Sequence, residues 1–218
     1  ASNNVAMGYG ALGANTTGAL NIAVGKDTLG ANTTGTRNVA VGSLALDANT
    51  TNDFNTAIGY AALSAVDSGY NTAVGYVALA SASTADSNTA VGYRAAYNTT
   101  TGGSNVAIGR AALDANTTGT ENVAIGKDAL KDSTTASYNT AVGTLANENN
   151  TTGASNTSVG RAALNENSTG SQNVAIGRSA LLANTTADSN TAVGYLALTA
   201  NTTGTRLVAV GASALDSV

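Results

Sequence analysis

A short apolar run recurs along the whole chain, each time between an asparagine and a glycine. With few exceptions it reads Asn-Thr/Val-Ala-Val/Ile-Gly, and it occurs thirteen times. The glycines stand 17 residues apart, except for a 16-residue interval between Gly59 and Gly75. A short period that holds over an entire chain is typical of a solenoid, in which each repeat is one coil that buries its apolar side against its neighbours. The pattern therefore predicts thirteen stacked coils.

Within each repeat, the order of residue types indicates β-structure. Counting the asparagine as position 1, the consensus is N-[TV]-A-[VI]-G-[YRK]-x-A-L-x-x-N-T-T-G-x-x. Positions 2 to 4 predict a short strand, because the β-branched residues at 2 and 4 share one face and the alanine at 3 takes the other. We expect the β-branched face and the leucine at position 9 to point inward. The glycine at position 5 predicts a bend, and Asn-Thr-Thr-Gly predicts a turn.

A helical coil is the alternative, since alanine and leucine favour helices. Fewer than eight residues of the consensus repeat, however, lie between the position-5 glycine and the Asn-Thr-Thr-Gly turn, which is too short for a stable helix. The predicted fold is therefore all-β, a parallel β-solenoid (β-roll) of thirteen 17-residue coils, about 60 Å long at about 4.8 Å per coil. We expect the position-1 asparagines to stack into a ladder of paired amides. The 16-residue coil, 55–70, should lose its residue from the loop, because its positions 1 to 9 are intact.

Composition is uniform over the 218 residues, so we expect a single repeat domain, 1–218, that is a fragment of a longer fibre. Charged residues make up only 10% of the chain, and the net charge is −4. An acidic chain is a poor partner for nucleic acid or for an anionic membrane. No apolar run approaches the roughly 20 residues that span a bilayer, so we expect no membrane insertion.

The residue inventory disfavours catalysis. The chain has no histidine and no cysteine, which removes the usual general base, the thiolate nucleophile and the soft metal ligands. Its thirteen Asp and Glu residues are scattered rather than paired at a recurring spacing, and no phosphate-binding glycine motif is present. We expect no enzymatic activity, no cofactor and no metal site.

Alanine occupies positions 3 and 8 in twelve of the thirteen coils each. Side chains this small imply close packing against whatever they face. One interpretation is that the interior of a thin coil requires them. The other is that a neighbouring chain packs against them, which predicts a homotrimer, because three-fold packing along a rod hides apolar surface that a single coil would expose.

Two coils lack the leucine of position 9 and carry Ala96 and Asn147 instead. Each coil loses about 2–5 kcal/mol of burial if nothing compensates. Tyr97 and Leu145 are placed to fill the two gaps. If they do not turn inward, these coils should be the weakest in the stack.

Position 6 is the candidate contact surface, because it carries aromatic or cationic residues in most coils. A column of such side chains could stack on sugars or on a partner surface; alternatively, the long side chains simply cover the edge of the coil. The candidates are Tyr9, Tyr60, Tyr76, Tyr93, Tyr195, Arg110, Arg161 and Arg178. The asparagine at position 12 forms Asn-x-Ser/Thr sequons in eight coils, which could accept N-glycans or could serve the turn alone.

The repeat motifs resemble those of known fibres. The string VAIG, for example at Val106–Gly109 and Val174–Gly177, resembles the head repeats of trimeric autotransporter adhesins. The full unit, as in NTAVGYLALTANTTG at Asn190–Gly204, resembles the arrays of phage-type tail fibres. The resemblance covers the whole chain and implies a left-handed β-roll, three chains packed side by side, and an extracellular location on a virion or a cell surface. The unit here is two or three residues longer than the adhesin repeat.

These observations together predict a non-catalytic shaft of an extracellular fibre. Its partners would be two further copies of the chain and a host-surface glycan or receptor, contacted weakly and repeatedly along position 6. The alternative is an ice-binding solenoid that uses ladders of threonine and asparagine to order water. Adjacent threonines of a turn do not form a flat array, which weighs against that alternative.

Overall fold

The computed structural model describes residues 2–217 and consists of thirteen short parallel strands. Each strand spans positions 2 to 4 of one repeat, and we number each coil by its strand. The strands are β1 (Val5–Met7), β2 (Ile22–Val24), β3 (Val39–Val41), β4 (Thr56–Ile58), β5 (Thr72–Val74), β6 (Thr89–Val91), β7 (Val106–Ile108), β8 (Val123–Ile125), β9 (Thr140–Val142), β10 (Thr157–Val159), β11 (Val174–Ile176), β12 (Thr191–Val193) and β13 (Val208–Val210).

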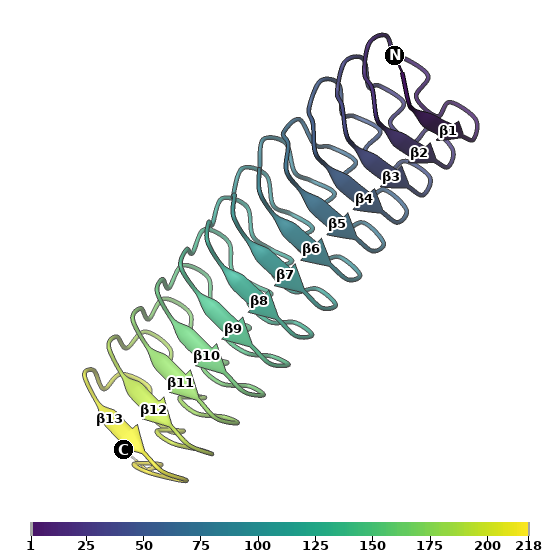
Figure 1. Ribbon diagram of the computed structural model, residues 1–218. Coiled ribbons are helices and arrows are strands. Elements are labelled where there is room, and N and C mark those ends of the chain that lie inside the picture. Colours follow the sequence, from purple (N-terminus) through teal and green to yellow (C-terminus); the bar gives the residue numbers. More distant parts are fainter. Residues whose placement is uncertain (1, 218) are drawn as a thin grey trace.

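The strands pair in chain order into one parallel sheet. Every pairing keeps the repeat in register, so that Ala107 lies beside Ala124 and Ala124 beside Ala141. Figure 1 shows the result, a rod in which the strands form one wall, the loops form the rest of each coil, and the two termini lie at opposite ends. The all-β parallel solenoid with 17-residue coils is confirmed. The part of the chain that the structure describes has no helix long and apolar enough to cross a membrane.

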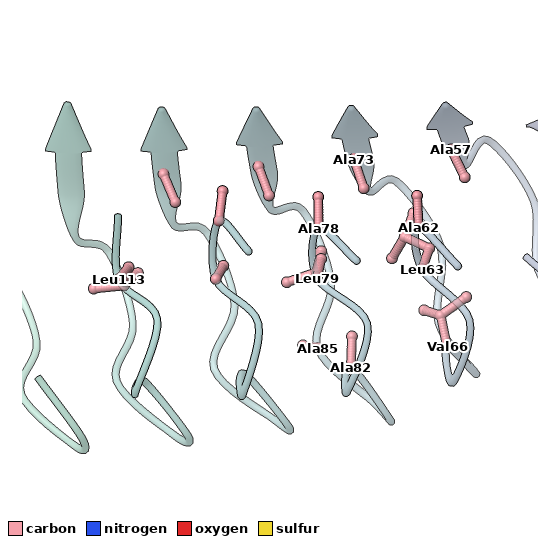
Figure 2. Packing of buried hydrophobic residues seen from close by; sticks show 14 of the residues in the cluster. Ala57, Ala62, Leu63, Val66, Ala73, Ala78, Leu79, Ala82, Ala85 and Leu113 are labelled. Atoms are coloured by element: carbon pink, nitrogen blue, oxygen red, sulfur yellow. The ribbon is translucent and has the colours of Figure 1, made fainter. Parts of the chain in front are cut away.

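The expected orientation of the strands was wrong. The alanines of position 3 point inward and are fully buried from coil 2 to coil 12, apart from the equally buried Ser158 that replaces one of them, whereas positions 2 and 4 face outward. Ile108, for example, is 38% exposed. The reason is the width of the interior: the strand lies so close to the opposite side of its own coil that only a small side chain, alanine or serine, fits between them. In Figure 2, Ala57 and Ala73 reach from their strands into the narrow interior that Leu63 and Leu79 fill from the other side.

The same geometry corrects the interpretation of the alanine rows. Ala107, Ala124 and Ala175 of position 3 are fully buried within the single chain, and so are Ala112 and Ala129 of position 8. They serve the interior of the coil and do not face a neighbouring chain. The homotrimer stays a prediction, but these rows no longer support it.

Three residues of most coils adopt a left-handed backbone conformation, at positions 7, 9 and 17. In coil 7 they are Ala111 (φ 52°), Leu113 (φ 56°) and Glu121 (φ 56°). This conformation costs a side-chain-bearing residue about 1–3 kcal/mol. Position 5 is stricter: Gly109 has φ 135°, and a Cβ there would collide with the carbonyl group of Gly126 in the next coil. Only glycine can turn the chain at that point.

Two rows of asparagine hold the coils together. Asn122 of position 1 donates from Nδ2 to the carbonyl of Ala136 in its own coil (2.8 Å), and its Oδ1 accepts the backbone N–H of Asn139 in the next coil (3.0 Å). The expected ladder therefore runs mainly from side chain to backbone. The amide-to-amide ladder lies instead at position 12, where Asn184 donates to Asn167 and Asn167 donates to Asn150, each at 2.9 Å.

The 16-residue coil absorbs its deletion in the loop, as predicted. The N–H of Asp67 donates to the carbonyl of Ser83, as position 13 does in other coils, and Asn55 Nδ2 donates to the carbonyl of Ser68, which takes the place of position 15. The missing residue is therefore the second threonine of the turn. Val66 replaces the asparagine of position 12 in this coil, which leaves Oδ1 of Asn49 without a hydrogen-bond donor.

The two coils without the position-9 leucine are not refilled. Tyr97 lies outside the core beneath the guanidinium of Arg94, whose Cζ is 4.3 Å from the ring centroid. Leu145 is only half-buried and does not belong to the buried core. The substitutes themselves, Ala96 and Asn147, occupy the interior with almost no exposed surface. The expectation that Tyr97 and Leu145 would compensate was wrong, because neither side chain enters the buried core.

Candidate functional surface

The described part of the rod offers no concave site. No pocket is present among residues 2–217, and no three acidic, histidine or cysteine side chains come together there in a metal-binding group. Any contact with a ligand must therefore use the convex outer surface. That surface has three components that repeat along the rod: the outward strand face and the two rows of side chains that border it.

The outward strand face carries no charge. Positions 2 and 4 hold only Val, Ile, Thr and one Met in all thirteen coils, although these side chains are half-buried or exposed. We call these 26 positions the neutral strip. Its isoleucines remain 37–40% exposed, and these are Ile22 and Ile58, Ile108, Ile125 and Ile176. Position 4 is apolar in every coil, whereas position 2 is threonine in six of them. An exposed apolar column along a whole rod is of the kind that normally marks a contact with another molecule.

The position-6 row borders the neutral strip just after the glycine bend. All eight candidate contact residues are exposed there: Tyr9, Tyr60, Tyr76, Tyr93, Arg110, Arg161, Arg178 and Tyr195. The row brings Tyr60, Tyr76 and Tyr93 together in consecutive coils. Tyr9 stands apart at the N-terminal end of the rod, and Arg110, Arg161 and Arg178 lie in its C-terminal half.

The three consecutive tyrosines stack on one another. The ring centroids of Tyr60 and Tyr76 are 5.4 Å apart and those of Tyr76 and Tyr93 are 5.5 Å apart, with planes within 14° of parallel. Farther along, the guanidinium of Arg178 lies over the ring of Tyr195 at 5.6 Å. The faces that a sugar ring would need are thus largely occupied by neighbours in the row. The row presents ring edges and hydroxyl groups to a ligand.

A second bordering row, at position 17, was missed from the sequence. Phe54 and Tyr70 stack there with centroids 5.2 Å apart, and the guanidinium of Arg37 lies 5.3 Å from the Phe54 ring. Tyr138 also lies in this row and is exposed. The position varies too much between repeats to stand out as a motif. The alternation of faces along the strand could have revealed this row. Position 17 lies two residues before position 2 of the next coil, so it belongs to the same outward face as positions 2, 4 and 6.

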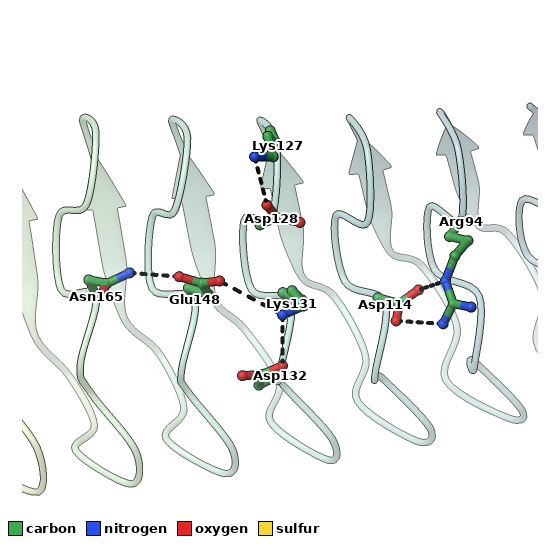
Figure 3. Close-up of polar contacts among 8 residues, drawn as sticks. All are labelled: Arg94, Asp114, Lys127, Asp128, Lys131, Asp132, Glu148 and Asn165. Atoms are coloured by element: carbon green, nitrogen blue, oxygen red, sulfur yellow. Dashed lines mark hydrogen bonds and ion pairs between the residues drawn. The ribbon is translucent and has the colours of Figure 1, made fainter.

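Ion pairs follow the opposite border of the coils (Figure 3). Arg94 donates from Nε and Nη2 to the two carboxylate oxygens of Asp114, both at 3.0 Å, and this pairing raises the pKa of Arg94. Lys131 lies 3.9 Å from both Asp132 and Glu148. Each of these carboxylates forms an ion pair with Arg94 or Lys131, and they do not come together into a metal-binding group within residues 2–217. Burial raises the pKa of the Asp47 carboxyl, which belongs to the same border.

The sequon asparagines do not suit glycan attachment in the folded rod. Asn116, Asn150, Asn167 and Asn184 of position 12 are fully buried. Their Nδ2 atoms, which would carry the glycan, donate to the carbonyl of position 15, as Asn150 does to Gly153 at 2.9 Å. The asparagines of this turn therefore close the coil, which is the interpretation based on turn chemistry.

Comparison with protein-family models, with characterised proteins and with solved structures gave no match to this chain. The resemblance to tail-fibre and adhesin repeats therefore rests on the motifs alone and stays a prediction.

Proposed function

We propose that this chain is the non-catalytic shaft of an extracellular fibre, on a virion or a cell surface. The observation that supports this most is the unbroken register of thirteen coils, each tied to the next by backbone hydrogen bonds and by the position-1 asparagine. Such a stack can bear load along its axis, and among residues 2–217 no coil carries an insertion that would extend its loop towards a protease. The lack of any pocket in residues 2–217 fits a role in which length and stiffness matter more than a single site.

In this proposal the shaft is a homotrimer that buries the neutral strip. An uncharged strip along about 60 Å of rod is favourably buried against another molecule. A second copy of the chain has the same rise per coil, so its rows of side chains can pack against those of the first copy in every coil. Weak glycan contacts along the position-6 row would be repeated in each chain, which favours avidity over tight binding at one site.

The assembly is tested by sedimentation of the chain and of two triple variants. Ile108→Glu, Ile125→Glu and Ile176→Glu together should convert a trimer into folded monomers, because these side chains lie outside the coil interior. The matched control places glutamates in the same coils on exposed turn threonines, at Thr118, Thr135 and Thr186, and should remain trimeric. A monomeric unmodified chain would remove the trimer from the proposal.

Ice binding is the second candidate, and the flat, ordered and uncharged strip is the observation that favours it. The ladders first considered for this role are poorly placed, because the asparagines are buried and the position-13 hydroxyls are bonded to carbonyls of the next coil, as Thr117 is to Thr134 at 3.0 Å. An ice-binding surface would have to use the strip. Thermal hysteresis in a solution of the purified chain, abolished by the three glutamates on the strip, would select this candidate.

A further inference from the structure

The position-6 row collects positive charge on an acidic protein. No coil carries Asp or Glu at this position, whereas five coils carry Lys or Arg: Lys26, Arg110, Lys127, Arg161 and Arg178. The rest of the chain then holds four cations against thirteen carboxylates. The row is therefore opposite in sign to the surface around it, and a segregated charge of this kind attracts ligands of the opposite sign.

Four of these cations lie within five consecutive coils. Arg110, Lys127, Arg161 and Arg178 belong to coils 7, 8, 10 and 11, so they span about 19 Å at about 4.8 Å per coil. Lys127 lies 3.5 Å from Asp128. The three arginines form no ion pair among residues 2–217, and Asp114, which shares a coil with Arg110, is already held by Arg94. Their charges are thus available to a ligand.

The spacing and the ring arrangement indicate which polyanion fits. A straight row of guanidinium groups suits an extended polymer with carboxylate or sulfate groups at regular intervals, since arginine binds such groups in bidentate fashion. A single-stranded nucleic acid would need open aromatic faces on which bases stack. The row offers few, because one face of Tyr195 is covered by Arg178 and the tyrosines of coils 4 to 6 cover one another.

We propose that the position-6 row from Arg110 to Tyr195 binds a linear acidic polysaccharide that lies along the rod axis. The three arginines contact its carboxylate or sulfate groups, and the hydroxyls of Thr144 and Tyr195 contact its hydroxyl groups. This inference rests on the proposed glycan contact of the shaft and names its chemical class. The aromatic block of coils 4 to 6 lies outside the binding segment.

Affinity electrophoresis and calorimetry test the proposal with four polymers: polygalacturonate, heparin, neutral dextran and oligothymidylate. We expect retention by polygalacturonate, by heparin or by both, which separates carboxylate from sulfate recognition, and none by dextran. Raising the salt from about 50 to about 200 mM should weaken the binding strongly, because the contacts are ionic.

The variant carrying Arg110→Gln, Arg161→Gln and Arg178→Gln should bind at least about tenfold more weakly. The matched control, Arg37→Gln with Arg206→Gln, removes cations from the position-17 row and should bind nearly as the unmodified chain does. Absence of binding to both acidic glycans, equal loss in the control, or equally tight binding of oligothymidylate would overturn the proposal. None of these outcomes affects the shaft, whose test is sedimentation.

Discussion

Coils 6 and 9 lose the same core leucine, yet the core responds to them differently. At Ala96 the buried core continues without interruption from coil 2 to coil 9. In coil 9 the run of buried apolar side chains ends at Ala146, and it resumes at Ala163 in coil 10, beyond Asn147 and the buried Ser158. Asn147 is fully buried, and neither its Nδ2 nor its Oδ1 has a hydrogen-bond partner in the described structure. Loss of volume at Ala96 therefore leaves the apolar interior continuous, whereas the buried polar side chains of Asn147 and Ser158 interrupt it.

The neighbourhood of Asn147 strengthens this contrast. In coil 8 the position-12 asparagine is replaced by Ser133, whose hydroxyl is also buried without a partner, and Oδ1 of Asn116 before it loses its donor. The amide ladder of position 12 is thus interrupted in coil 8, next to coil 9, in which the leucine row of position 9 is interrupted. Beside coil 6 the ladder is interrupted too, by Ala82 in coil 5, but Thr99 of coil 6 accepts a hydrogen bond from Asn116 at 3.3 Å. In the described structure, no buried side-chain polar atom of coils 5 and 6 lacks a partner.

The largest expected effect comes from moving the polar defect into the continuous core. Leu113→Ala should cost about 2–5 kcal/mol of local stability. Leu113→Asn should cost about 1–3 kcal/mol more, because two buried polar atoms would lack partners. Hydrogen exchange of the amides in coils 6 to 8 measures the local opening free energy of each variant. Equal losses in the two variants would show that volume alone determines core continuity.

The reverse change should repair coil 9. Asn147→Leu is expected to stabilise the coil by about 2–4 kcal/mol, since it restores burial and removes two unpaired atoms. Before the change, amides of coils 8 to 10 should exchange fastest in the interior of the rod. Asn149→Leu, on an exposed position of the same coil, is the matched control and should give no such gain. A neutral Asn147→Leu would mean that an ordered water already satisfies the amide.

Filling coil 6 should help less. Ala96→Leu is expected to add about 1–3 kcal/mol, because it recovers buried apolar surface but relieves no unpaired polar atom. The adjacent Ala95→Leu tests whether space is specific to position 9, and overpacking there should cost about 1–3 kcal/mol. Urea unfolding of both variants gives the comparison. A larger gain at Ala96 than at Asn147 would reverse the ranking of the two defects.

The smallest effect should be identical in the two coils. Ser104 (φ 59°) and Ser155 (φ 58°) are the exposed, left-handed position-17 residues of coils 6 and 9. Replacing either by glycine should stabilise by about 0.5–1 kcal/mol, as the relief of backbone strain exceeds the added chain entropy. Ala154→Gly, next to Ser155 but with an ordinary φ, should destabilise instead. Unequal gains at Ser104 and Ser155 would show that the core defect reaches the backbone around it.

The sequence period was sufficient to predict the coil, the strand at positions 2 to 4 and the place of the deletion. The period was not sufficient to decide which strand face points inward. Alternation places positions 2 and 4 on one face and position 3 on the other, but it does not say which of the two faces is buried. The preference of Val and Ile for buried positions gave the wrong choice. The deciding quantity was the width of the interior, which admits only small side chains such as those of Ala107 and Ser158.

The surface was less predictable than the fold. The position-6 row was visible because Tyr, Lys and Arg recur there, and its residues do lie along one exposed edge. The stacking of Tyr60, Tyr76 and Tyr93 on one another could not be predicted, because it depends on the rise per coil, about 4.8 Å, being close to the distance between stacked rings. The position-17 row, with Phe54 and Tyr70, was hidden by its varied composition.

Because of the position-1 asparagine, whole coils can be added to the rod or removed from it without breaking the contacts between coils. Asn122 donates a hydrogen bond to Ala136, which closes its own coil, and it accepts one from Asn139, the first residue of the next coil. Each coil therefore contains the groups that close it and the group that binds the next coil. A genetic duplication or loss of 17 residues would leave every such joint intact, while a change of a few residues is tolerated only in the turn. We therefore expect the length of the rod to change in steps of about 4.8 Å, one step for each coil.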